Sequence, residues 1–158
     1  MTGEAFIPYG RQNINQDDID AVVSVLKSDF LTQGPAIELF EKSVASLCGA
    51  KYAVAVSNAT AALHIACLSL DFAPGDLLWT SPNSFVASAN CALYCGASVD
   101  FVDIDVNSYN ISVAELHEKL SDRKSKGLQL PKVVVPVHFA GLSAEMEKIR
   151  ALSLEYGF

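Results

Sequence analysis

The sequence lacks the features that would direct a protein to a membrane or into the secretory pathway. Its first residues, MTGEAFIPYGRQ, contain no basic segment followed by an apolar core, so we expect no targeting signal. The most apolar stretch toward the other end, residues 133–140, is far too short to span a bilayer. We therefore expect a cytoplasmic protein.

Charged residues are scarce, and the basic ones are outnumbered. Only 18% of the 158 residues are charged, 51% are hydrophobic, and the net charge is −7. This composition supplies enough apolar surface for one compact domain and argues against disorder. An acidic surface repels phosphate backbones and anionic lipid, so we expect no nucleic acid and no membrane as partners. A local basic pocket for an anionic small molecule stays open.

Cysteine is also rare, with four residues at positions 48, 67, 91 and 95. The chain is large and shows no secretion signal, so these residues do not indicate a disulfide framework. Cys91 and Cys95 are four residues apart in an expected helix and share one face. A metal site there would need two more ligands nearby, and no histidine pair has suitable spacing. We predict no metal site and interpret the cysteines as buried free thiols.

The common nucleotide and hydrolase signatures are missing as well. The sequence contains neither the lysine-bearing Walker loop nor GxGxxG after a strand, and spacing assembles no Ser/His/Asp or Cys/His set. His64 is expected in a hydrogen-bonded core and His117 on a solvated helix face. His138 follows a strand and precedes Gly141, which makes it a candidate site residue. Asp103 and Asp105 are either paired carboxylates or, as we favour, part of a turn.

The patterns that are present alternate between helix and strand. Helices are expected over residues 17–28, between Gly34-Pro35 and Gly49, and over 59–70, 85–95, 112–121 and 143–155. Strands are expected over 52–56, 77–80, 99–104 and 132–137. The helix over 59–70 is expected to be buried on most sides, and residues 123–129 to form a solvated loop. The order predicts an α/β fold with a mostly parallel sheet and flanking helices. We expect one domain, 1–158, with an N-terminal arm (1–34) and an α/β part (35–158).

Ligands of open α/β sheets bind at the carboxyl ends of strands, so the loops there are candidate sites. The segment Ser57-Asn58-Ala59-Thr60 leaves backbone N–H groups free at a helix start, which suits a phosphate, and Thr60 adds a hydroxyl. Spacing alone favours the alternative, an ordinary helix cap by Ser57 or Asn58. Phe85 begins the next helix, where its ring would either lie flat on a planar heterocycle or pack in the core.

Six segments, taken in order, resemble a known family. They are IPYGRQNI (7–14), LTQGP (31–35), VSNATAALHIA (56–66), TSPNSFVASAN (80–90), CGASVDFVDID (95–105) and PVHFAG (136–141). Over nearly its whole length the chain resembles the DegT/DnrJ/EryC1/StrS sugar aminotransferases. The resemblance implies the N-terminal part of the large domain of a fold-type-I transferase that depends on pyridoxal 5'-phosphate.

The resemblance also implies roles for particular residues. Ala59 and Thr60 would bind the cofactor phosphate, and Phe85 would stack on the pyridine ring. The residues implied to line the nucleotide-sugar or cofactor pocket are Tyr9, Asp29, Phe30, Leu31, Thr32 and Asn58. The complete enzyme would transfer an amino group from glutamate to the 4-keto position of a UDP-linked sugar, as a homodimer.

The sequence departs from the family in length. Members are more than twice as long, and neither their cofactor-pairing aspartate nor their Schiff-base lysine motif has a counterpart here. We therefore assign no catalytic residue and expect an N-terminal portion that is inactive alone. Two alternatives stay open. One is a family sugar dehydratase, in which another residue replaces the lysine, although IPYGRQNI favours transamination. The other is a non-catalytic α/β fragment that associates with another chain.

Overall fold

The computed structural model describes residue 8 and residues 10–158. Contacts group the chain into two compact units, Met1–Ala55 and Val56–Phe158. The boundary between these units differs from the one expected between arm and α/β part. The expectation of a single domain over 1–158 stays a prediction.

The first unit contains two of the expected helices. Helix α1 (Gln16–Leu26) begins at Asn15, whose side chain accepts the Asp17 and Asp18 N–H groups while Asp18 accepts the Asn15 N–H, a complete capping box. Helix α2 (Pro35–Cys48) starts with proline in its first turn. It ends at Gly49 with φ of 63°, a left-handed conformation that glycine adopts without strain. Both helices confirm the sequence pattern.

The strand expected over residues 52–56 is wrong. These residues pair with no strand in the described part of the chain, and the side chains of Tyr52 and Val54 are exposed. The Ala55 N–H donates to Glu41 Oε1 at 2.8 Å and not to a neighbouring strand. An apolar, β-branched segment becomes a strand only where a second strand completes its hydrogen bonds, and the described residues offer none here.

The second unit is built on a parallel sheet. Within the described residues it has three strands, β1 (Leu77–Thr80), β2 (Ser98–Phe101) and β3 (Val133–Val135), in the order β2-β1-β3. Leu78 pairs with Val99 on one side and Val133 on the other. Strand β1 has the expected bounds, whereas β2 and β3 are shorter than expected. The predicted α/β fold with a parallel sheet and flanking helices is confirmed.

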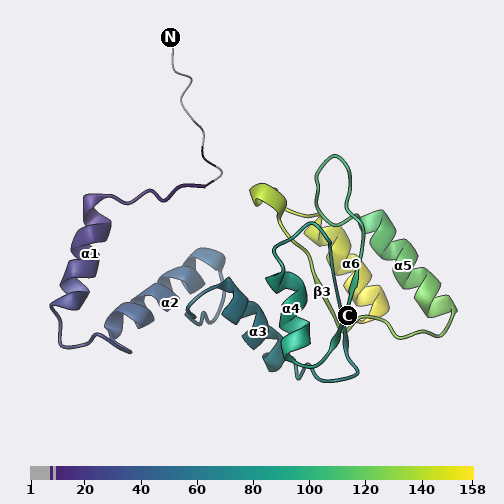
Figure 1. Ribbon diagram of the computed structural model, residues 1–158, viewed down its shortest axis with the longest axis horizontal. Coiled ribbons are helices and arrows are strands. Elements are labelled where there is room, and N and C mark those ends of the chain that lie inside the picture. Colours follow the sequence, from purple (N-terminus) through teal and green to yellow (C-terminus); the bar gives the residue numbers. More distant parts are fainter. Residues whose placement is uncertain (1–7, 9) are drawn as a thin grey trace, which may run out of the picture. The chain divides into compact units, whose positions relative to one another are not determined.

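The two faces of the sheet carry separate apolar clusters. Leu78 faces a cluster with Cys67 and Cys91, from α3 (Ala59–Ser69) and α4 (Ala87–Tyr94). Leu77 and Trp79 face the opposite cluster, which α5 (Val113–Ser125) and α6 (Met146–Tyr156) complete. Helices α3 and α4 lie side by side, as do α5 and α6 (Figure 1). Alternation along β1 therefore produces a three-layered unit.

Two expectations about these helices are wrong. Helix α3 was expected to be buried on most sides, but Cys67 is its only buried residue, and Ile65 and Leu68 are about half exposed. Its apolar composition reflects surface that nothing covers within the second unit. Helix α5 extends to Ser125, into the expected loop over 123–129, and its last turn carries Arg123 and Lys124, basic side chains that the helix dipole favours there.

Candidate functional site

The start of α3 leaves two backbone donors free. Asn58 is the N-cap residue: its Oδ1 accepts the Ala61 N–H at 2.9 Å, and its carbonyl oxygen accepts the Ala62 N–H at 3.1 Å. The N–H groups of Ala59 and Thr60 precede these and have no acceptor among the described residues. The cap interpretation of Asn58 is thus confirmed, and the cap still leaves two donors for an anion.

Helix α3 leads into β1 and packs against α4, which connects β1 to β2. The positive end of the α3 dipole lies at the start of α3, beside the free Ala59 and Thr60 N–H groups.

The loop after β1 carries Phe85 and an unexpected hydroxyl. Phe85 is 75% exposed, so the core alternative for its ring is wrong. The Ser81 side chain is only 1% exposed, and its Oγ has no hydrogen-bond partner among the described residues. Both residues line a pocket of about 190 Å³ together with Phe101. Sequence reasoning missed Ser81, whose only signal was its place directly after a buried strand.

The loop after β2 is a turn held by a carboxylate, as favoured from the sequence. Asp105 Oδ1 accepts the Ser108 N–H at 2.9 Å, the Ser108 hydroxyl at 3.0 Å and the Asn107 N–H at 3.1 Å. The Ser108 N–H bond, more than the others, lowers the pKa of Asp105 below its usual value. Asp105 is therefore fixed as a turn carboxylate and not as one of a catalytic pair.

The three histidines have different surroundings. His64 is half-buried with its ring 5.2 Å from that of Tyr94, and no hydrogen bond to it is found among the described residues, so the hydrogen-bonded core expectation fails. His117 is exposed, as expected. His138 is exposed and lies between the end of β3 and the short turn over residues 139–141. Its Nδ1 accepts the Ala144 N–H at 3.0 Å.

The thiols are free, as expected, but not all buried. Cys67 and Cys91 lie in the core between α3 and α4, and Cys48 is exposed, contrary to expectation. Burial, followed by contact with Cys91, raises the pKa of the Cys67 thiol to about 12. Such a thiol stays protonated and unreactive. The part of the chain that the structure describes contains no group of three or more side chains suited to a metal ion.

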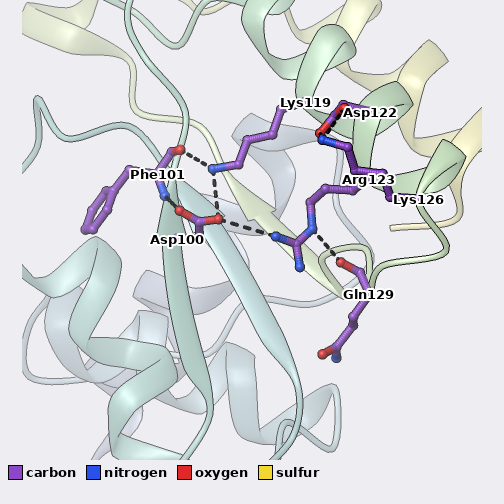
Figure 2. A network of polar contacts seen from close by, with 7 residues as sticks. All are labelled: Asp100, Phe101, Lys119, Asp122, Arg123, Lys126 and Gln129. Atoms are coloured by element: carbon purple, nitrogen blue, oxygen red, sulfur yellow. Dashed lines mark hydrogen bonds and ion pairs between the residues drawn. The ribbon is translucent and has the colours of Figure 1, made fainter.

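A polar network joins β2 to α5 (Figure 2). Lys119 Nζ donates to the Phe101 carbonyl at 2.6 Å and pairs with Asp100 at 2.8 Å, while Arg123 Nε donates to the Gln129 carbonyl at 2.8 Å. Burial acts to raise the pKa of Asp100, but the hydrogen bonds from Lys119 and the Phe101 N–H and the charges of Lys119 and Arg123 together outweigh it, and the pKa is lowered. Lys119 Nζ also lies 4.8 Å from the centroid of the buried Trp79 ring. Through Lys119, these contacts hold α5 against strand β2.

The residues implied to bind the substrate are divided between the units. Asp29, Phe30, Leu31 and Thr32 connect α1 and α2 in the first unit, and all four are exposed. Asn58, Ala59, Thr60 and Phe85 belong to the second unit. Tyr9 lies outside the described residues. A common pocket for these residues stays a prediction.

Solved structures define the class of fold. An aminotransferase of the DegT/DnrJ/EryC1/StrS type from Brucella abortus matches with a TM-score of 0.82 and 29% identity, over 88% of this chain and 37% of that one. Spr1654 from Streptococcus pneumoniae, solved in its PLP form, matches with a TM-score of 0.81 and 25% identity, over 92% and 36%. The fold is that of pyridoxal-phosphate-dependent aminotransferases.

The sequence comparisons define the family. The model of the DegT/DnrJ/EryC1/StrS aminotransferase family matches residues 12–158. Spore coat polysaccharide biosynthesis protein SpsC of Bacillus subtilis is 40% identical over 96% of this chain and 37% of its own length. Helicobacter pylori PseC, an aminotransferase involved in pseudaminic acid biosynthesis, is 32% identical, with a TM-score of 0.81 over 96% of this chain and 39% of that one.

The chain belongs to the DegT/DnrJ/EryC1/StrS aminotransferase family, whose cofactor is pyridoxal 5'-phosphate. It spans 37% of the length of SpsC. None of the helices in the described part of the chain has the length and apolarity needed to cross a membrane.

Proposed function

We propose that this chain supplies the phosphate-binding and ring-stacking part of a pyridoxal-phosphate-dependent sugar aminotransferase. One observation carries the proposal: the N–H groups of Ala59 and Thr60 at the start of α3 have no acceptor among the described residues, and a helix start with free donors suits a phosphate. The buried Ser81 hydroxyl, which follows β1 and has no hydrogen-bond partner in the described part of the chain, is a second sign that a polar ligand completes the site.

Each residue has a definite part in holding the cofactor. The Ala59 and Thr60 N–H groups and the Thr60 hydroxyl would donate to the phosphate, which the α3 dipole also stabilises. The exposed Phe85 ring would stack on the pyridine ring and fix its plane. When bound, the cofactor withdraws electrons from the carbon that carries the transferred amino group. The chain's own contribution is binding and orientation.

For the complete enzyme, we propose amino transfer from glutamate to the 4-keto group of a UDP-linked deoxy sugar in pseudaminic acid biosynthesis. The specific activity proposed is that of a UDP-4-amino-4,6-dideoxy-N-acetyl-β-L-altrosamine transaminase. The likeness to PseC over 96% of this chain supports it. Tyr9, Asn58 and the segment from Asp29 to Thr32 are the proposed substrate contacts. The complete enzyme is proposed to act as a cytoplasmic homodimer.

The chain of 158 residues is proposed to be inactive alone. It contains no counterpart of the lysine motif that forms the Schiff base in the family. Without that amine, no group of the described site is placed to form the imine and then move its proton. Binding without turnover is the expected behaviour.

The test compares pyridoxal 5'-phosphate with pyridoxal, which lacks the phosphate, using quenching of the fluorescence of the single tryptophan, Trp79. We expect the phosphorylated form to bind at least about tenfold more tightly, because only it engages the α3 start. Thr60→Val, which keeps the shape and removes the hydroxyl, should weaken binding of the phosphorylated form about tenfold and leave pyridoxal unaffected.

The control is Ser69→Ala at the other end of α3, where the Ser69 hydroxyl donates a hydrogen bond to the Ala66 carbonyl at 2.8 Å. It should change neither affinity. Equal affinities of the wild-type chain for the two compounds would contradict the proposed function.

A further inference from the structure

A small pocket lies at the carboxyl ends of β1 and β2. Thr80 and Phe101, the last residues of the two strands, are paired in register, and both line the pocket. The loop after β1 and the start of α4 form the rest of the wall, which includes Ser81 and Phe85. The volume of about 190 Å³ is below the roughly 300–1,000 Å³ that encloses a whole drug-sized ligand, so the pocket suits one substituent of a larger molecule.

The wall of this pocket is neutral. Among the described residues that line it there is no charged side chain. Phe85 is 75% exposed and Phe101 is 47% exposed, so two aromatic side chains border the pocket without being packed in the core. An ion that entered such a pocket would lose hydration without gaining an opposite charge. The pocket therefore favours a neutral group, and a planar one can stack on an aromatic ring.

Most of the hydroxyl groups on the wall already use their hydrogen atoms. Thr80 Oγ1 donates to the Val135 carbonyl at 2.9 Å, and Ser84 Oγ donates to the Phe85 carbonyl at 3.1 Å. The Ser84 and Ser88 hydroxyl oxygens lie 2.7 Å apart. Because the Ser84 hydrogen is used at Phe85, the Ser88 hydroxyl is the donor in that contact.

Ser81 supplies the remaining hydroxyl. The residue is 1% exposed, and its Oγ has no hydrogen-bond partner among the described residues. A buried hydroxyl without a partner destabilises a fold, and nearly all buried polar groups in proteins are bonded. Since Ser81 lines the pocket, a group that enters the pocket is the partner that this hydroxyl is placed to bind. The chemistry that matches a hydroxyl donor in a neutral pocket is a carbonyl oxygen.

We propose that Ser81 is a ligand-binding residue, and that this pocket takes a neutral acyl-amide group whose carbonyl oxygen accepts the Ser81 hydroxyl hydrogen. The amide plane would stack on the Phe101 ring, which leaves the Phe85 ring for the cofactor. Val86 and Ala89 supply apolar wall for the acyl methyl group. The proposed sugar substrate carries such a group as its N-acetyl substituent, and this identification rests on the proposed function.

The first experiment adds N-methylacetamide, a neutral amide without phosphate or sugar, to the full chain and follows the backbone amides by ¹⁵N NMR. We expect the amides of Ser81 and Phe101 to shift and to saturate at one concentration, while that of Leu152 in α6 stays in place. Acetate, which carries a charge instead of the neutral amide, should give no saturable shift at Ser81 or Phe101. No saturable shift with N-methylacetamide, or equal affinity for acetate, would overturn the inference.

Ser81→Ala tests the hydroxyl itself. The substitution should raise Kd for N-methylacetamide about tenfold, because the donor is lost. It should leave the urea midpoint of unfolding unchanged or raise it, because it removes a buried polar group that has no partner. An unchanged Kd would overturn the assignment. So would a lower urea midpoint, since it would mean that a trapped water molecule already satisfies the hydroxyl.

Ser88→Ala is the matched control on the same wall. It removes a hydroxyl whose hydrogen is already bonded to Ser84, and it frees no other donor, so Kd for the amide should stay nearly unchanged. A loss equal to that in Ser81→Ala would overturn the specific role of Ser81.

The amide titration and the test of the proposed function fail independently. N-methylacetamide has no phosphate, so its failure to bind would leave the phosphate site at Ala59 and Thr60 standing. Equal affinities for pyridoxal 5'-phosphate and pyridoxal would contradict the proposed function. Amide binding at Ser81 would then still support the pocket, and its identification with the N-acetyl group of a sugar substrate would be wrong.

Discussion

At the scale of single residues, some polar groups in the loops after the strands are bonded to backbone and others are not. Asp105 is bonded within its own loop, and Asn110 is bonded to the loop after β3. The Ser81 hydroxyl and the Ala59 and Thr60 N–H groups have no partner among the described residues. Sequence reasoning identified Ala59 and Thr60 because a helix start can be read from local pattern. It missed Ser81 and Asn110, whose burial depends on segments distant in the chain.

The Asp105 carboxylate should make the stability of the fold depend on pH. Its folded-state pKa is below the usual value of 3.8, so its contribution to stability is present above that value and is lost as pH falls through the lower folded-state pKa. Asp105→Ala should therefore unfold at lower urea concentration than wild type at about pH 7 and show a much smaller difference at about pH 2. The measurement is urea unfolding of both proteins at the two pH values. A difference that is independent of pH would contradict the role of the charged carboxylate.

At the scale of elements, prediction succeeded where local pattern and tertiary partner agreed. Strand β1 was predicted with its bounds because LLWT is apolar and is paired on both sides. Residues 52–56 have a similar pattern but no partner strand among the described residues, and pattern alone cannot show that. Helix α3 is the converse case, since its bounds were predicted almost correctly while its burial was not.

The cap of α3 gives a prediction at this scale. Asn58→Ala removes the oxygen that accepts the Ala61 N–H and should lower the free energy of unfolding by about 1 kcal/mol. Asn58→Asp keeps an acceptor beside the positive end of the helix dipole and should stay within about 0.5 kcal/mol of wild type. Urea unfolding followed by circular dichroism measures both changes. Equal loss in the two variants would show that the cap bond is not what stabilises the helix start.

At the scale of the whole molecule, the second unit has a well-packed interior and a strongly apolar exterior. Ile65 and Leu68 on α3 are 47% and 51% exposed, and Phe85 is 75% exposed. Apolar surface of this kind favours association with another copy or another protein. The acidic net charge of −7 opposes association only weakly at physiological salt.

We therefore predict that the chain associates as its concentration rises. Light scattering coupled to size exclusion should show a mass that increases with loading, and Leu68→Glu should shift the distribution toward monomer. Leu154→Glu on α6, which alters a position 79% exposed on the opposite layer, is the matched control and should have a smaller effect. A monodisperse monomer at every loading would contradict the prediction.

We propose that this chain holds pyridoxal 5'-phosphate without bonding to it covalently. The absorbance spectrum of the purified chain, titrated with pyridoxal 5'-phosphate and followed by borohydride reduction and mass mapping of every lysine, tests this proposal. We expect saturable binding that Thr60→Val weakens, with no lysine labelled stoichiometrically. Stoichiometric labelling of a single lysine would mean that the chain carries its own Schiff-base residue, and the proposal would be wrong.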